Sequence, residues 1–169
     1  MFILVVVVLI ACSFESKLQE FISETGGFSI MAPSSLKEVT QSVNMAFGKT
    51  DLYIFSSNQG KKAYFVAYFD FPADFARQNG PQKLLDGGCE RAVGNINGKL
   101  ISDIKISLSG NPGRELVIDA KLANGEDRTL RERLFIVGDR LYNVTVVAPR
   151  GEINSSDIDF LKSLKLYSK

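Results

Sequence analysis

The sequence predicts an α+β domain in which helices pack on an antiparallel β-sheet. Strand-like runs follow one another with short turn signals between them, and apolar residues recur at helical spacing in a few segments only. The predicted order is several strands, a helix, four strands and a final helix, which is not the regular alternation of a βαβ fold. The clearest part is a three-strand meander over residues 114–122, 129–137 and 140–148, with turn signals at Asn124-Gly125 and Gly138-Asp139.

The alternation of side chains predicts the register at the first of these turns. With an odd-numbered loop around Asn124, Leu116 lies beside Leu134 and apolar side chains share one face. A two-residue loop would instead set Ile118 against Arg131 and bury a charge, because a one-residue slip reverses every side chain. We therefore expect a loop of about three or five residues there.

The second turn fits a two-residue loop that begins at Gly138, which pairs Phe135 with Tyr142. One face of the meander is then mostly apolar, whereas the other is apolar near Gly138 and charged near Asn124. A sheet with this pattern is covered on one face and partly covered on the other.

The remaining elements follow from the same signals. A continuous apolar run over residues 62–69 predicts a central strand that is covered on both faces. A single helical turn is expected over residues 74–78, and Pro81 then suits the first position of a longer helix. The buried stripe of that helix is expected to contain Leu85, Cys89, Ala92 and Ile96.

The capping residues 154–156 predict a last helix that buries Ile158, Leu161 and Leu164. Further strands are expected over residues 28–31, 36–40 and 100–108, with a hairpin of 43–47 and 52–56 around a turn at 48–51.

Length, charge and composition narrow the classes of function. The chain has 169 residues, enough for one domain, and a net charge of +1, which argues against a nucleic-acid partner. It contains no histidine, the most frequent general base and transition-metal ligand. We therefore predict no catalytic residues, no metal site and no cofactor. Cys89 has apolar helical neighbours and is expected to be a buried, inert thiol.

The first residues form an apolar run that is too short to span a bilayer and suits the apolar region of a secretory signal. The run ends in Leu9-Ile10-Ala11-Cys12, which resembles a bacterial lipobox, in which the cysteine is acylated. We therefore expect a signal peptide over residues 1–12 with lipidation of Cys12, a tether over 13–26 and one domain over 27–169. No lysine or arginine precedes the run, which departs from the lipobox pattern. One alternative is a buried amino-terminal strand or helix, and another is a disulfide from Cys12 to Cys89.

Short motifs in a fixed order extend across most of the predicted domain. They are the segments at 28–33, 113–115, 133–142 and 160–164. Together they resemble the PsbP-like group, which includes extrinsic photosystem II proteins and bacterial lipoproteins. The resemblance implies an α/β/α sandwich and a non-enzymatic binding or assembly protein, often lipid-anchored at a membrane face. Metal-site histidines of some members have no counterpart here, because the chain lacks histidine.

Basic residues of the meander are the candidates for binding an anion. They are Arg114, Arg131, Arg133 and Arg140. The alternative, which we favour, is that they form weak cross-strand pairs with Glu115, Asp119, Glu132 and Asp139.

These patterns favour a membrane-anchored lipoprotein of the cell envelope, facing the periplasm or the exterior, that acts as a non-catalytic binding or assembly-accessory module. Its partners would be the membrane, through the lipid anchor, and a protein that the sequence does not identify. A first alternative is a carboxylate-dependent hydrolase or metal-dependent enzyme, which needs at least two acidic side chains that converge in a cleft. A second alternative, based on fold analogy, is a soluble partner of a GTPase or a secretion system.

Overall fold

A computed structural model of the chain describes residues 17–167. The expected signal peptide and its lipobox residue, Cys12, lie outside the described residues. Within residues 17–167, no helix is both long and apolar enough to cross a membrane.

The main sheet has seven antiparallel strands, and a smaller sheet has three. The main sheet runs in the order β3 (Lys37–Met45), β4 (Gly48–Gln59), β5 (Lys62–Asp70), β9 (Arg140–Pro149), β8 (Asp127–Val137), β7 (Asn111–Lys121) and β6 (Lys99–Leu108). The small sheet consists of β1 (Gln19–Ser23), β2 (Phe28–Ala32) and β10 (Lys165–Leu166). The helices are α1 (Ala73–Asn95) and α2 (Ser155–Lys162).

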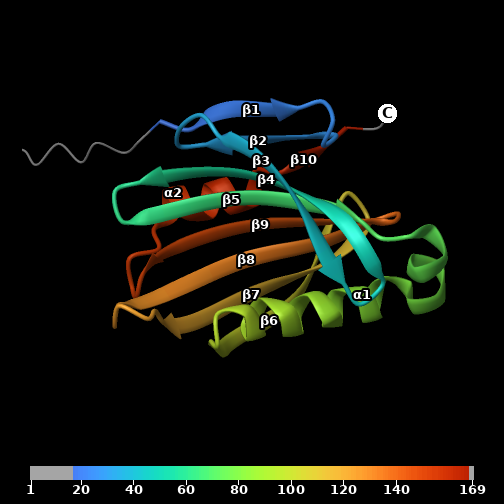
Figure 1. Cartoon of the computed structure of the whole chain (residues 1–169). Coiled ribbons are helices and arrows are strands. Elements are labelled where there is room, and N and C mark those ends of the chain that lie inside the picture. The colour runs from blue at the N-terminus through green and yellow to red at the C-terminus, as the bar shows by residue number, and fades with distance from the viewer. Residues whose placement is uncertain (1–16, 168–169) are drawn as a thin grey trace, which may run out of the picture.

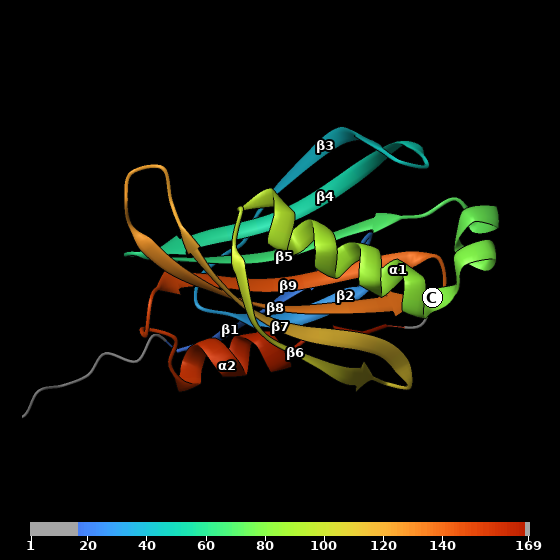
Figure 2. The same ribbon diagram turned by 90° about the horizontal axis from the view of Figure 1, so that it is seen from below.

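The two faces of the main sheet are covered differently (Figures 1 and 2). On one face, here called the α1 face, α1 lies over β7 and β8. On the other, the α2 face, α2 and the small sheet pack against the strands. The predicted α+β class with antiparallel strands is therefore confirmed. The α/β/α sandwich that the resemblance implies is found only in part, because a small sheet shares the second face with a helix.

The meander has the predicted faces and turn lengths. Residues 122–126 form the first loop, since Lys121 pairs with Asp127. The pairing is nevertheless shifted by two residues, so Leu116 lies opposite Glu132 and not Leu134. The loop is centred on Asn124, because the next residue, a glycine, adopts a positive φ of 86° and the Asn124 side chain accepts a hydrogen bond from the loop backbone. A shift of two residues keeps every side chain on its predicted face.

The second turn is the predicted two-residue loop, with Phe135 opposite Tyr142. The hairpin of β3 and β4 differs from expectation. Its turn is formed by Ala46 and Phe47, and residues 48–51, predicted to turn, belong to β4. This tighter turn brings the Phe47 ring onto three aromatic rings at the end of β5 and the start of α1.

The amino-terminal part of the body also extends further than expected. Residues 13–26 were assigned to a tether, but Gln19–Ser23 form β1 and pair with β2. The folded body therefore begins before residue 27. The side chain of Phe21 explains this, because its ring packs on Phe28 and Phe55 of the core beneath the small sheet.

Both helices begin as the sequence predicts. A short helical segment before Gly80 is separated from the main part of α1 by non-helical torsion angles at that glycine, and Pro81 starts the second segment. At α2, the Asn154 side chain accepts from the Asp157 amide and the Asp157 carboxylate accepts from the Asn154 amide, forming a capping box.

The structure corrects the expectation for the central strand. On the α2 face of β5, Tyr64, Val66 and Tyr68 are buried. On the α1 face, the alternate residues Phe65, Ala67 and Phe69 are only half-buried. Because the close contacts of α1 with the sheet are to β7 and β8, this face of β5 is left only partly covered. The continuous apolar run therefore marks a partly open surface.

Candidate functional site

A groove follows the uncovered part of the α1 face, between α1 and the β3–β4 hairpin. Its floor is formed by β5, β8 and β9. It contains two adjoining hollows of about 260 Å³ and 450 Å³, here called the aromatic end and the polar end. The residues that line both hollows, and so connect them, are Met45, Phe69, Arg91 and Leu141.

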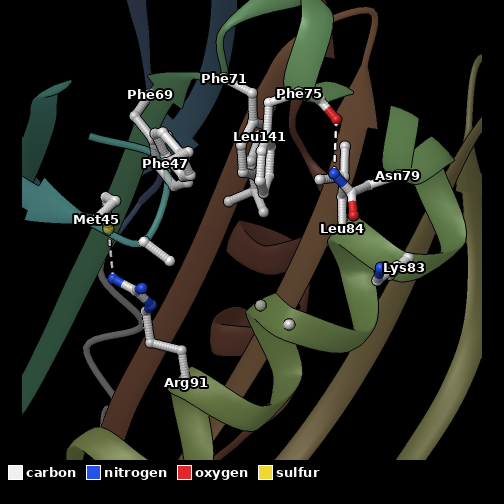
Figure 3. A pocket seen from close by; sticks show the side chains of 13 residues that line it. Met45, Phe47, Phe69, Phe71, Phe75, Asn79, Lys83, Leu84, Arg91 and Leu141 are labelled. Atoms are coloured by element: carbon white, nitrogen blue, oxygen red, sulfur yellow. Dashed lines mark hydrogen bonds between the residues drawn. The ribbon is translucent and has the colours of Figure 1, made fainter. Parts of the chain in front are cut away.

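The aromatic end is built from rings that three elements bring together (Figure 3). Phe47 comes from the hairpin turn, Phe69 and Phe71 from the end of β5 and the loop after it, and Phe75 from the first segment of α1. The Phe47 ring centroid lies 5.1 Å from those of Phe71 and Phe75, and 6.0 Å from that of Phe69. These distances are typical of packed aromatic pairs, so the rings form a defined apolar wall. Leu141 on β9 completes it.

Two basic side chains of α1 border the aromatic end. Lys83 and Arg91 both line it, with Gly87 between them on the same side of the helix. Figure 3 shows Arg91 reaching from α1 towards Met45 on the hairpin, where a guanidinium nitrogen contacts the sulfur. Neither basic residue forms an ion pair with any residue in the part of the chain that the structure describes.

The polar end has a buried carboxyl group on its floor. Glu132 is 4% exposed and lines the hollow on the α1 face of β8. One of its oxygens accepts a hydrogen bond from the Asn143 side-chain amide on β9. The Asn143 carbonyl oxygen accepts in turn from the Thr145 hydroxyl at 2.5 Å. Burial raises the pKa of Glu132 to about 7, and the hydrogen bond from Asn143 opposes this shift. The groove therefore contains a carboxyl group that is largely protonated just below neutral pH.

Sequence reasoning placed Glu132 among cross-strand ion pairs, and this was wrong. The signal that could have identified it was present, because Glu132 alternates with Leu130 and Leu134 on an apolar face. A glutamate inside such a pattern marks either a buried hydrogen-bond partner or a ligand site, and among the described residues no arginine forms an ion pair with Glu132.

The structure does not bring the four predicted arginines together. Arg114 lies on the α1 face, where it donates to Asp103 on β6 at 2.6 Å and to Asp86 on α1 at 2.9 Å. Arg140 lies on the α2 face and donates to both oxygens of Asp70 at 2.6 and 2.8 Å. Its guanidinium carbon also lies 4.3 Å from the centre of the Tyr68 ring. Each of these arginines therefore joins neighbouring elements.

Arg131 and Arg133 share one acidic partner. Arg131 donates to Glu115 at 2.9 Å, and the Arg133 Nε lies 3.1 Å from the other Glu115 oxygen. Arg133 also donates to the Leu161 carbonyl of α2 at 3.3 Å. Burial lowers the pKa of Arg133. Of the four predicted acidic partners, Glu115 alone forms ion pairs with these arginines among the described residues.

Among the residues that the structure describes, the remaining reactive groups offer no second site. Cys89 is buried, and burial raises the pKa of its thiol to about 11. Among residues 17–167, no three His, Cys, Asp or Glu side chains gather as a metal site would require. Glu132 is the single carboxylate among the described residues that line the groove.

Comparison with solved structures shows where this arrangement of elements recurs. The solution structure of the cyanobacterial PsbP protein CyanoP from Synechocystis sp. PCC 6803 superposes with a TM-score of 0.63 at 15% identity, covering 94% of this chain and 99% of that one. The chain has a PsbP-like fold. A crystal structure from Bacteroides thetaiotaomicron VPI-5482 superposes with a TM-score of 0.54 at 12% identity. The match covers 90% of this chain but only 50% of that one, so this chain spans about half the length of that protein. No family model and no curated protein matches the sequence.

Within this PsbP-like fold, the groove is a place where the apolar core is left partly open. The α2 face is sealed by the small sheet and α2. On the α1 face, α1 seals β7, β8 and the part of β9 around Leu141. An uncovered apolar floor with a few polar groups has the chemistry of a small-ligand site.

Proposed function

We propose that the chain is a non-catalytic binding module, held at a membrane of the cell envelope by lipidation of Cys12, and that its groove takes an apolar ligand. The observation that carries the binding role is the uncovered α1 face of β5. Phe65, Ala67 and Phe69 on this face are half-buried and line the groove. In a strand covered on both faces, such side chains would instead pack against a helix or a second sheet.

The energetic argument concerns apolar surface in contact with water. Burying such surface is favourable by about 25 cal/mol per Å². Large apolar areas left open on a folded protein mark interaction sites. The two hollows together are of the size of known small-ligand pockets, which span roughly 300–1,000 Å³. A ligand that fills the groove would bury this surface.

A carboxylate-dependent enzyme fits the groove less well. That alternative needs two acidic side chains that converge in one cleft. Among the described lining residues the groove has Glu132 alone, and its hydrogen-bond partners are the amide and hydroxyl side chains described above. A binding role requires no second carboxylate.

The lipobox-like sequence Leu9-Ile10-Ala11-Cys12 supports lipidation of Cys12, and hence a location at a membrane. One acyl chain alone gives reversible attachment, whereas the additional chains of a lipoprotein make it effectively permanent. Cells that express the chain would be grown with a radioactive fatty acid. Label on the wild-type chain and its loss in Cys12→Ser are expected, and label that persists in the variant rules out the anchor.

Binding in the groove can be mapped with the full chain in nanodiscs of zwitterionic phosphatidylcholine. A photoreactive decanol with a diazirine near its tail would be irradiated with the protein, and the labelled residues would be located by mass spectrometry. We expect label in residues 43–47 and 65–75, which line the groove from the hairpin and from β5.

A blocking variant and a matched control complete this test. Ala67→Trp places a large side chain on the groove floor and is expected to reduce the labelling roughly tenfold. Ile104→Trp changes an exposed apolar residue of β6 outside the groove and is expected to leave it unchanged. Equal labelling of the two variants, or label spread evenly over the surface, contradicts a groove site.

A further inference from the structure

We propose that the ligand of the groove is a single-chain amphiphile with a carboxylate head, whose chain lies over the aromatic end and whose head binds between Lys83 and Arg91. This inference rests on the proposed binding role of the groove and adds the chemical class of the ligand. It follows from the charges at the rim, the shape of α1 there and the lining of the aromatic end.

Arg91 differs from every other arginine in residues 17–167. The others all form an ion pair with a carboxylate; they are Arg77, Arg114, Arg128, Arg131, Arg133, Arg140 and Arg150. Arg91 instead extends over the groove to the sulfur of Met45. A guanidinium at the edge of an apolar hollow that forms no ion pair among the described residues is complementary to an anionic group on a ligand.

Lys83 gives a second positive charge on the same side of α1. The two residues are two helical turns apart, about 12 Å along the helix axis. Gly87 lies midway and, with no side chain, leaves the rim open between them; an added Cβ there would meet nothing within 4 Å. Two long, flexible cationic side chains can therefore approach one head group from both sides. No acidic residue lines this end of the groove among the described residues.

The aromatic end suits a hydrocarbon chain better than a polar body. Four phenylalanine rings, Leu84 and Leu141 line it, and its polar neighbour Asn79 uses its amide to donate to the Phe75 carbonyl at 2.8 Å. Each further methylene buried there is expected to tighten binding roughly three- to fourfold. Octanoic, decanoic and dodecanoic acids should therefore bind in rising order until the hollow is filled.

A cationic amphiphile is the competing ligand class, because Glu132 lies in the same groove. Two features oppose it. Glu132 is on the floor of the polar end and not on the rim, and its neighbours Asn143 and Thr145 are neutral. The charged groups that face the rim, Lys83 and Arg91, would repel an ammonium head.

The test compares three photoreactive probes with the same chain, decanoic acid, decanol and decylamine, on the full chain in nanodiscs of phosphatidylcholine at neutral pH. We expect the acid to label the aromatic end roughly tenfold more efficiently than the alcohol, and the amine least of all. The double variant Lys83→Gln with Arg91→Gln should reduce labelling by the acid to the level of the alcohol. The readout is the ratio of acid to alcohol labelling, which corrects for any general effect of the substitutions on the groove and should fall from roughly ten to about one.

Lys105→Gln is the matched control, since Lys105 is an exposed cation on β6 outside the groove lining. This variant should leave labelling by all three probes unchanged. Equal labelling by acid and alcohol, or an acid signal that persists in the double variant, overturns the carboxylate head and leaves the apolar site in place. Preferential labelling by the amine also overturns it. If none of the probes labels the groove, the proposed binding role itself fails.

Discussion

Glu132 shows how a single side chain can set a pH dependence. Its side chain is nearly inaccessible to solvent. It accepts a hydrogen bond from Asn143, which in turn accepts one from Thr145. No cation forms an ion pair with it among the described residues, so the charged form is disfavoured by burial and its pKa rises to about 7. The chain contains no histidine, so few other groups titrate in the same range.

The first prediction is that stability falls as the pH rises from about 5 to 8. In this range the folded state holds a proton on Glu132 that the unfolded state, with a carboxyl pKa of 4.5, has already lost. Folded protein therefore binds more protons than unfolded protein, and the free energy of unfolding decreases with pH by roughly 3 kcal/mol in total. Urea unfolding followed by circular dichroism at several pH values measures this slope.

Glu132→Gln should remove most of the slope while keeping the shape of the side chain and its contact with Asn143. Glu90→Gln is the control, because Glu90 is exposed on α1. A slope that is the same in the wild type and in Glu132→Gln shows that another group is responsible.

The same residue marks a limit of the sequence. Alternation placed Glu132 on the apolar face correctly, as it did for the neighbouring leucines. The second turn, which the sequence predicts correctly, already sets Thr145 of β9 opposite Glu132, but strand pairing does not show which side chains hydrogen-bond. The donor to Glu132 is Asn143, which lies opposite Leu134. Charge rules then favoured an arginine, although the nearby arginines of β8 point to the opposite face.

At the scale of elements, Asp157 fixes α2 to the sheet. It is 1% exposed and accepts from the Lys62 ammonium and the Tyr64 hydroxyl of β5, both at 2.6 Å. It also closes the capping box of its own helix. Burial, together with this carboxylate, raises the pKa of Tyr64. One side chain thus caps the first turn of α2 and also attaches that helix to β5.

The second prediction is that Asp157→Ala destabilises the protein by roughly 3 kcal/mol, because the half-buried Lys62 and the buried Tyr64 lose their partner. Asp159→Ala, an exposed residue of the same helix, should change stability by less than about 0.5 kcal/mol. Chemical denaturation of both variants gives the comparison. A loss in Asp157→Ala no larger than in Asp159→Ala would show that α2 is held by its apolar contacts alone.

The third prediction contrasts two glycines of α1. Gly80 has φ 70° and ψ 163°, which a residue with a side chain adopts only under strain, so Gly80→Ala should cost about 1–3 kcal/mol. Gly87 lies in the regular part of the helix with open space around it, so Gly87→Ala should stabilise by about 0.5–1 kcal/mol. Thermal unfolding of the two variants checks the opposite signs. A stabilising effect at Gly80 would mean that the break in α1 is not required.

Elements whose signals are local were predicted well. The break before Pro81, the cap at Asn154 and the turn at Gly138 each depend on residues close in sequence. The turn of the β3–β4 hairpin was misplaced, because its position depends on a contact of Phe47 with rings that lie more than twenty residues away in sequence. The edge strand β6 also contains a bulge near Ile101 that the regular alternation of its residues did not predict.

At the scale of the whole molecule, the groove results from uneven coverage of one sheet. Sequence reasoning expected a covered β5 because its residues are apolar at every position. A strand sequence cannot show how far along the sheet a crossing helix lies. The helix α1 packs on β7 and β8, and the β3–β4 hairpin extends beyond it with Val39 47% exposed. The hairpin therefore packs along its α2 face, and on the α1 face it is held mainly at its turn, where Phe47 contacts the rings near the start of α1.

The fourth prediction follows from this geometry and concerns local stability. Elements with few buried contacts open more readily than the core, so the amides of β3 should exchange with deuterium faster than those of β8 and β9. Hydrogen exchange of the full chain in nanodiscs, followed by mass spectrometry, measures the difference.

A ligand in the groove would contact α1 and the hairpin at once, through residues such as Arg91, Ala92, Val43 and Met45. Bound decanol is therefore expected to slow exchange in β3 and β4 severalfold, since a ligand that binds the folded hairpin stabilises it against local opening. The opposite edge strand, β6, is outside the groove and serves as the internal control. Slower exchange in β6 to the same extent would indicate a general effect of the alcohol, and unchanged exchange in β3 would show that the ligand does not join the hairpin to α1.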